Sequence, residues 1–436
     1  MDVLLAVVAI IVLVILFAHA NLNVMTFLVY NSMTALVGLC LLAVDGVAYW
    51  TTAAAYGGAV VALLTGFVAG AALRIAPRPQ TALRTAKKAT LFRFPLPAMH
   101  ATVWIVGLAA CYHLVASGIP LFSSSVEVER FDFTSSGFFG VPGRMYLYGV
   151  PLVWMLSASV AQQQGIKWRK YGPWKAATVF FVTTAMLSGF KSGLLALTVT
   201  MIVSYVVISK QTLPLRDLVR RYWFLLLIPV VYGLALASTY TSYQGTDSSL
   251  FRQLLNRVTL VGAQPKQYAI EHRVAGPIEN GILNDLGYFI QKYTGQSVAG
   301  EYSFERAVSA RIINVNPASN AWTTPVTVGG IPELIFTLGA PLAMLAVFAV
   351  GVLLRVAHGG GSGVLGSFIR AGFVYATYSW LLKGGLVYYF LNIAVVAVMV
   401  LGILFVAGLF LPGRSERPVK TRGATIRMRP VEASTR

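Results

Sequence analysis

The chain has 436 residues, of which 57% are hydrophobic and only 11% are charged, and its mean hydropathy is +0.71. Soluble domains carry about a quarter charged residues, so this composition excludes a soluble globular protein and predicts an all-α polytopic membrane protein. The net charge of +19 is common in nucleic-acid-binding proteins, but its distribution along the chain argues against that partner.

Apolar segments of roughly 20 residues, the length of a transmembrane helix, recur along the chain. The first follows Met1-Asp2 with no basic residue before it, so we expect a retained span rather than a cleaved signal peptide. We predict about eleven spans, at approximately 3–18, 24–44, 49–73, 98–116, 144–161, 174–188, 193–209, 222–238, 331–354, 366–382 and 386–411. Eight of these define a first region, residues 1–237, and the last three a second region, residues 331–411.

Lysine and arginine in short connections mark the cytoplasmic side of a membrane protein. If eleven spans alternate, the basic connections all fall on one side, and they are Arg74–Arg93, Lys167–Lys175, Lys210–Arg221, Arg355–Arg370 and the basic tail 412–436. We therefore predict a cytoplasmic C-terminus and a positive charge that faces anionic lipid. The outer, periplasmic side then contains a loop at 117–143, short turns at 189–193 and 383–385, and a large loop at 238–330.

The large loop, residues 238–330, is rich in both charged and aromatic residues. Connections of this length are usually functional or disordered, and the aromatic content argues for a folded segment. Helical spacing of apolar residues predicts an amphipathic helix at 250–261 and a second helix at 304–312, which carries Arg306 and Arg311. We expect a helical loop that caps the bundle.

Basic residues are concentrated near the predicted outer ends of the spans. Lys191 lies between Gly189 and Gly193, where a cation is costly unless it is paired, faces water or extends to the interface. The arginines of this side are Arg130, Arg144, Arg252, Arg257, Arg273 and Arg311. Each one could be a solvated or ion-paired residue, but as a set they could bind phosphate or pyrophosphate, because the guanidinium group matches phosphate oxygens.

The acidic residues Glu127, Glu129 and Asp132 lie in the loop at 117–143. One interpretation gives them a chemical role, either as oxygen ligands of a divalent metal or with one of them as a base, and a second makes them a water-facing edge paired with Arg130 and Arg144. The second interpretation is favoured because no histidine or cysteine accompanies them, so we expect no metal and no other cofactor.

His272 and a polar segment before the ninth span are the remaining candidates. His272 could act as a general base near neutral pH or be a surface histidine between charged neighbours. Asn320, Trp322 and Thr323 suit the recognition of a sugar by stacking and hydrogen bonding, although Trp322 could also belong to an interfacial aromatic belt.

Three features resemble the oligosaccharide repeat-unit polymerases of the O-antigen polymerase type, which are bacterial integral membrane glycosyltransferases related to the O-antigen ligases. They are Ser117–Ser123 with the later Glu129-Arg130 and Gly143-Arg144, the turn Ser188–Gly193, and the passage from Asn320–Pro325 into a span with Glu333 and Gly339. Related enzymes often carry arginine where this chain has Lys191.

This resemblance implies a metal-independent GT-C glycosyltransferase of the inner membrane that acts on its periplasmic face. The growing chain on undecaprenyl pyrophosphate would be transferred to a sugar hydroxyl of a new lipid-linked unit, without a nucleotide sugar. Membrane lipids and a regulator of chain length would be further partners. His272, Lys191 and Arg273 would be catalytic, and the substrate would be bound by Arg130, Arg144, Arg252, Arg257, Arg311, Asn320, Trp322 and Thr323. The alternatives are an O-antigen ligase, a flippase or exporter of lipid-linked oligosaccharide, and a non-catalytic scaffold.

Overall fold

The computed structural model describes most of the predicted spans and parts of the large loop. The described residues are 21–22, 24–72, 94–119, 122, 140–187, 191–209, 213–214, 262–272, 283, 285–287, 289–290, 304–312, 327–359 and 363–411. The predicted spans at 3–18 and 222–238, the amphipathic helix at 250–261 and the basic tail lie outside these residues.

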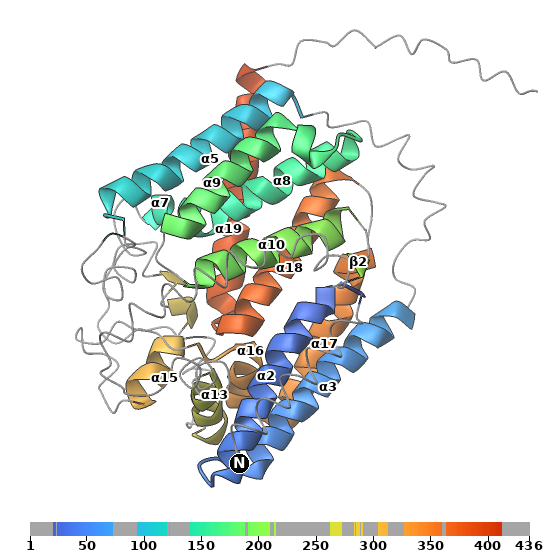
Figure 1. Ribbon diagram of the computed structural model, residues 1–436, viewed down its shortest axis with the longest axis vertical. Helices are drawn as coiled ribbons and strands as arrows, with labels where there is room; N and C mark the ends of the chain where they lie inside the picture. Colours follow the sequence, from blue (N-terminus) through green and yellow to red (C-terminus); the bar gives the residue numbers. More distant parts are fainter. Residues whose placement is uncertain are drawn as a thin grey trace, which may run out of the picture.

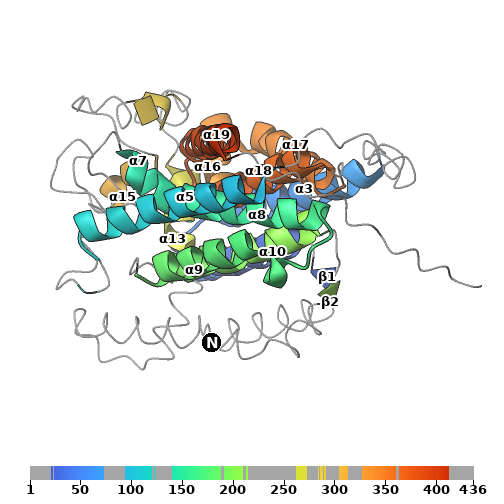
Figure 2. The same ribbon diagram turned by 90° about the horizontal axis from the view of Figure 1, so that it is seen from above.

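Helices account for nearly all of the described elements (Figures 1 and 2). In chain order they are α2 (Val24–Val44), α3 (Trp50–Ala72), α5 (Leu96–Ala116), α7 (Val141–Arg144), the π-helical turn η3 (Met145–Gly149), α8 (Val150–Gln163), the 3-10 turn η4 (Trp168–Lys170), α9 (Gly172–Leu187), α10 (Lys191–Ile208), α13 (Gly262–Glu271), α15 (Phe304–Ile312), α16 (Gly330–Leu338), α17 (Ala340–Gly359), α18 (Val364–Lys383) and α19 (Leu386–Phe410). Two short strands, β1 (Asn21–Leu22) and β2 (Leu213–Pro214), form one antiparallel pair with Asn21 opposite Pro214.

Four helices in the described part of the chain, α3, α5, α17 and α19, are long and apolar enough to cross a bilayer. Many of their large apolar side chains remain exposed, among them Leu108 on α5 and Phe405 on α19. Exposed leucine and phenylalanine side chains along an apolar helix suit contact with lipid. Lipid offers no hydrogen-bond partners to the backbone, so a helix, which satisfies its own backbone groups, is favoured there. The chain is a helical membrane protein, as the composition predicts.

Helices α3 and α17 lie side by side (Figure 1) and pack closely through glycine. A Cβ atom on Gly66 would overlap the carbonyl oxygen of Phe348, and one on Gly351 would overlap that of Leu63. Small residues let two helix backbones approach in a membrane, where packing rather than the hydrophobic effect holds helices together.

The ninth predicted span, 331–354, is not one continuous helix. Gly339 has φ 80° and ψ 160° and separates the nine-residue α16 from α17. At 1.5 Å per residue, α16 is about 13 Å long and too short to cross a bilayer. Seven of its eight side chains, from Ile331 to Thr337, are buried, so α16 is an internal half-helix at one end of the bundle.

Candidate functional site

Segments that the sequence places on the outer side meet at one end of the helices. The backbone N–H of Gly329, before α16, donates to the carbonyl of Lys383 at the end of α18, with 2.8 Å between N and O. Helix α13 packs against α2, α15 and α16, and these elements gather at the same end in Figure 1. The contacts thus unite parts of the large loop with the 383–385 turn.

Three helices at this end begin against a carboxylate from another element. Asp285 Oδ1 accepts from the N–H of Phe304, the first residue of α15, at 2.8 Å. Glu333 Oε1 accepts from the N–H of Leu386, the first residue of α19, at 3.0 Å. Glu271 accepts from the N–H of Tyr49, directly before α3, at 2.9 Å. The first N–H groups of a helix lack partners within it and attract negative charge, so each carboxylate stabilises the helix start that it contacts.

The Lys383–Gly385 turn is the centre of a charged cluster. Gly384 has φ 104° and Gly385 has φ 74°, values that favour glycine. A Cβ atom on Gly384 would lie 3.6 Å from Glu305 Cγ, and one on Gly385 would lie 3.4 Å from Asp285 Oδ2. Two carboxyl side chains therefore lie directly against the two glycines. We call Asp285, Glu305, Glu333 and Lys383 the turn cluster.

Burial shifts the ionisation of the carboxyl groups that come from the large loop. It raises the pKa of Asp285 to about 6, although the hydrogen bond from Phe304 opposes the shift. Burial also raises the pKa of Glu305 well above its ordinary value; Lys383 opposes this shift, while Asp285 and Glu333 add to it. A carboxyl group whose pKa approaches neutrality, as that of Asp285 does, can both take up and release a proton, as general acid–base catalysis requires.

Lys266 on α13 is a second buried cation near this end of the bundle. It is 6% exposed, and its Nζ donates to the carbonyl of Gly262 at 2.7 Å. Burial lowers the pKa of Lys266 to about 8. A Cβ atom on Gly329 would lie 3.7 Å from Lys266 Cε, so this lysine packs against the segment that bonds to Lys383.

Aromatic and amide side chains extend the turn cluster toward η3. Lys383 Nζ lies 5.5 Å from the ring centroid of Tyr389, a cation–π distance. The ring of Tyr148 meets that of Tyr389 edge to face, with 6.4 Å between centroids. Arg144, one turn before Tyr148 and 5% exposed, donates from Nε to Asn392 Oδ1 at 2.8 Å.

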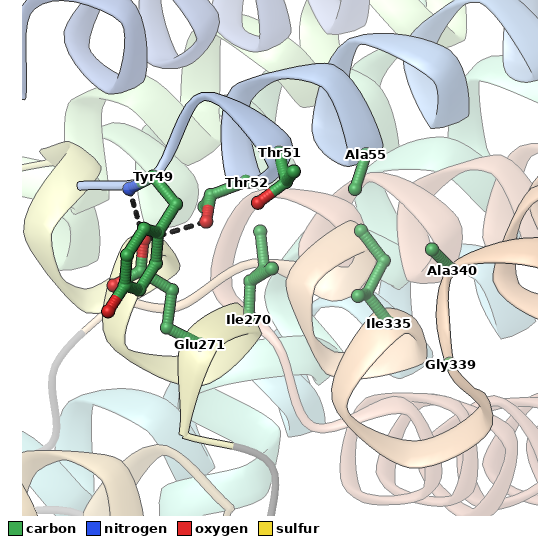
Figure 3. A pocket seen from close by; sticks show the side chains of 9 residues that line it. All are labelled: Tyr49, Thr51, Thr52, Ala55, Ile270, Glu271, Ile335, Gly339 and Ala340. Atoms are coloured by element: carbon green, nitrogen blue, oxygen red, sulfur yellow. Dashed lines mark hydrogen bonds between the residues drawn. The ribbon is translucent and has the colours of Figure 1, made fainter. Parts of the chain in front are cut away.

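A groove of about 410 Å³ lies on the other side of α16 (Figure 3). Its apolar part consists of Ala55, Ile270, Ile335 and Ala340, and Thr51, Thr52 and Glu271 give it a polar end. Residues two positions apart on an α-helix are separated by about 200° around its axis, so Glu333 and Ile335 are on opposite faces of α16. The half-helix therefore separates the groove from the turn cluster.

The described residues include four of the predicted site residues. Arg144 is brought to the bundle interior, one turn from Tyr148. His272 is exposed and stacks on Tyr268, with 4.1 Å between ring centroids. Lys191 is the first residue of α10, and Arg311 lies in the last turn of α15. The other predicted residues lie outside the described ranges: Arg130, Arg252, Arg257, Arg273, Asn320, Trp322 and Thr323, together with Glu127, Glu129 and Asp132.

Lys383, Glu305 and Asp285 are not among the site residues predicted from the sequence. One signal was available: the Lys383–Gly385 turn, like the Lys191 turn, has a single cation beside glycine between two apolar segments. The acids gave no such signal, because nothing in the local sequence indicates that they contact helix starts elsewhere. Across the described residues, no group of three or more histidine, cysteine, aspartate or glutamate side chains is arranged to hold a metal ion.

Comparisons with known proteins return no match: no family model, no curated protein and no solved structure is similar to this chain.

Proposed function

We propose that this protein polymerises oligosaccharide repeat units carried on undecaprenyl pyrophosphate, at the periplasmic face of a bacterial inner membrane. One observation carries the proposal: Glu305 packs against Gly384 through Cγ and interacts electrostatically with the neighbouring Lys383, at the end of the bundle where the predicted outer segments meet. The proposed reaction requires a proton acceptor and a positive charge at adjacent positions, and these two side chains supply them.

The proposed reaction assigns one role to each group. A hydroxyl of the acceptor sugar gives its proton to Glu305, and its oxygen forms a bond to the anomeric carbon of the donor chain. The bond between that carbon and the pyrophosphate oxygen breaks, and the electron pair leaves with the pyrophosphate. Lys383 stabilises the departing negative charge, and one well-placed donor of this kind is worth about a 10²–10³-fold change in rate.

The proposal includes the wider arrangement that the sequence predicts. About eleven spans hold the site at the membrane surface, and the large loop 238–330 covers it. Arg130, Arg144, Arg252, Arg257, Arg273 and Arg311 then supply further contacts to phosphate, and Asn320, Trp322 and Thr323 contact sugar. An O-antigen ligase would use the same donor chemistry with lipid A core as the acceptor.

A flippase or exporter of lipid-linked sugars is the second candidate, and one observation favours it. Glu333 is 1% exposed on the internal half-helix α16, and its side chain accepts hydrogen bonds from α18 and from the start of α19. Ionisable groups inside a membrane bundle often form the proton path of a transporter.

Reconstitution separates these functions. The purified protein is placed in vesicles with lipid-linked repeat units extracted from cells that lack it, and the products are separated by size. We expect a ladder of polymer for the wild type and its loss in Lys383→Gln and Glu305→Gln.

Glu271→Gln is the matched control, because it changes a carboxylate that caps a helix on the other side of α16. Wild-type ladders in both cluster variants would exclude this site from the reaction. Movement of a labelled lipid-linked unit across the bilayer without a ladder would favour the flippase, and product formed only with added lipid A core would favour the ligase.

A further inference from the structure

Two buried tyrosines face each other where η3 meets α19. Tyr148 is 5% exposed and Tyr389 is 7% exposed, and their rings meet at 83°. Among the described residues, no hydrogen bond involves either hydroxyl. Tyrosine hydroxyls usually find a hydrogen-bond partner when the ring is buried, and a ligand is one group that could supply it.

Both tyrosines belong to the neighbourhood of the turn cluster. Tyr148 interacts electrostatically with Glu305 and with Tyr389, and Tyr389 interacts with Glu305 and Asp285. The ammonium group of Lys383 lies over the Tyr389 ring. Two hydroxyls, carboxyl groups and an ammonium group therefore share one small region.

The local backbone gives an independent sign of a functional site. Tyr148 lies in η3, a five-residue π-helical turn between α7 and α8. Such turns are rare and are frequently found at functional sites. Here the turn carries Tyr148 on the surface that faces α19, one helical turn after Arg144.

We propose that the hydroxyls of Tyr148 and Tyr389 bind the sugar ring next to the diphosphate of the lipid-linked ligand. A sugar hydroxyl both donates and accepts hydrogen bonds, and so does a tyrosine hydroxyl. The carboxyl groups add acceptors, the ammonium group adds donors, and the tyrosine rings add an apolar surface for the sugar face. This inference rests on the proposed function, since the proposed ligand supplies both sugar and diphosphate.

The test compares two ligands in binding measurements on purified wild-type protein and on Tyr148→Phe and Tyr389→Phe. One ligand is the lipid-linked repeat unit, and the other is undecaprenyl diphosphate without sugar. One lost hydrogen bond is worth roughly 0.5–1.5 kcal/mol, so each variant should bind the sugar-bearing ligand about two- to tenfold more weakly. Binding of the bare diphosphate should not change.

Tyr56→Phe is the control, because Tyr56 is also buried, at 3% exposed, but belongs to α3. Thermal unfolding of each variant confirms that it is folded. Unchanged affinity for the sugar-bearing ligand in both variants, or equal weakening for the two ligands, would overturn the inference.

The two proposals fail in different ways. A polymer ladder together with unchanged affinity in the phenylalanine variants would leave the polymerase standing and remove the sugar site. Sugar-dependent binding that the variants lose, in a protein that forms no ladder, would keep the sugar site and remove the polymerase.

Discussion

Glu333 on α16 and Trp380 on α18 are joined by a buried hydrogen bond, with 2.9 Å between the carboxylate Oε2 and the indole Nε1. The same carboxylate accepts from the N–H of Leu386 at the start of α19. One side chain therefore connects three helices and lies directly beside the Lys383–Gly385 turn. Its removal should loosen the turn that carries Lys383.

We predict that Glu333→Ala lowers the free energy of unfolding by about 3 kcal/mol, because it leaves two buried donors without an acceptor. Glu333→Gln keeps one acceptor oxygen and should cost less. Unfolding by denaturant in detergent micelles measures both changes. A double-mutant cycle with Trp380→Phe isolates the hydrogen bond, and additive effects would show that Glu333 and Trp380 do not act together.

The contact between α3 and α17 gives a second prediction. Gly66→Leu and Gly351→Leu force side chains into the opposing backbone. Each should lower the free energy of unfolding by about 1–3 kcal/mol or more, the usual cost of overpacking. The yield of folded protein after purification and its melting temperature measure the effect. Gly402→Leu on α19 is the control, because a Cβ atom there meets nothing within 4 Å, and equal losses in all three variants would contradict the close contact.

Asp285 gives a prediction about pH. Its pKa is about 6 in the folded protein and 3.8 in an unconstrained chain, so the folded state binds the proton more tightly. The ionised group therefore destabilises the fold above pH 6, and this penalty disappears as the pH falls from 6 toward 4. Asp285→Asn keeps an acceptor for Phe304 and cannot ionise.

We expect Asp285→Asn to be more stable than the wild type by about 1–3 kcal/mol at pH 7.5, with the difference shrinking below pH 6. Melting temperatures of both proteins from pH 4.5 to 8 measure it. A difference that stays constant across this range would show that Asp285 does not titrate there.

Two residues compete for the role of proton acceptor, and their variants separate them. His272 is exposed and stacked on Tyr268, whereas Glu305 is next to Lys383. We expect His272→Ala to keep about half or more of the wild-type rate of polymer formation, because it changes an exposed side chain outside the site. Glu305→Gln should lower that rate by about 10²-fold or more. The reverse result in the reconstituted assay would assign the base to His272.

Arg144 can be tested through its partner. Arg144→Lys keeps the charge but loses the Nε donor to Asn392, so both Arg144→Lys and Asn392→Ala should reduce polymer formation by about tenfold. Protein levels in the membrane and thermal unfolding show whether the fold is retained. Wild-type polymer in both variants would remove this pair from the site.

Metal dependence is checked directly with a chelator. We expect EDTA to leave the polymer ladder unchanged, because the proposed reaction uses Lys383 for charge stabilisation. A loss that Mg²⁺ or Mn²⁺ restores would instead implicate Glu127, Glu129 and Asp132.

Local patterns in the sequence predicted the helical elements well. The predicted segment 24–44 is α2, and 49–73 is α3 within one residue at each end. The helix predicted at 304–312 is α15, and its apolar side chains Phe304, Ala307 and Val308 are buried. Ile312, the last residue of α15, is 39% exposed, because it lies beyond the packed turns of the helix.

The break at Gly339 and the turn cluster could not be read in the same way. A hydropathy window averages over residues and does not register one glycine with a positive φ inside an apolar run. Asp285, Glu305 and Glu333 look like ordinary acids, because their partners are determined by contacts between distant segments. Only the tertiary structure of the described residues reveals that Asp285 and Glu333 accept hydrogen bonds from the first N–H groups of helices near Lys383.

The contact between Glu271 and the start of α3 has a consequence for biosynthesis. Tyr49 and Glu271 are 222 residues apart in the sequence, so α3 leaves the ribosome long before the side chain that completes its first turn. At about 5–20 residues per second, this interval lasts roughly ten to forty seconds. During that time the amino end of α3 depends on water or lipid headgroups, and its final placement must wait for the later half of the polypeptide to enter the membrane.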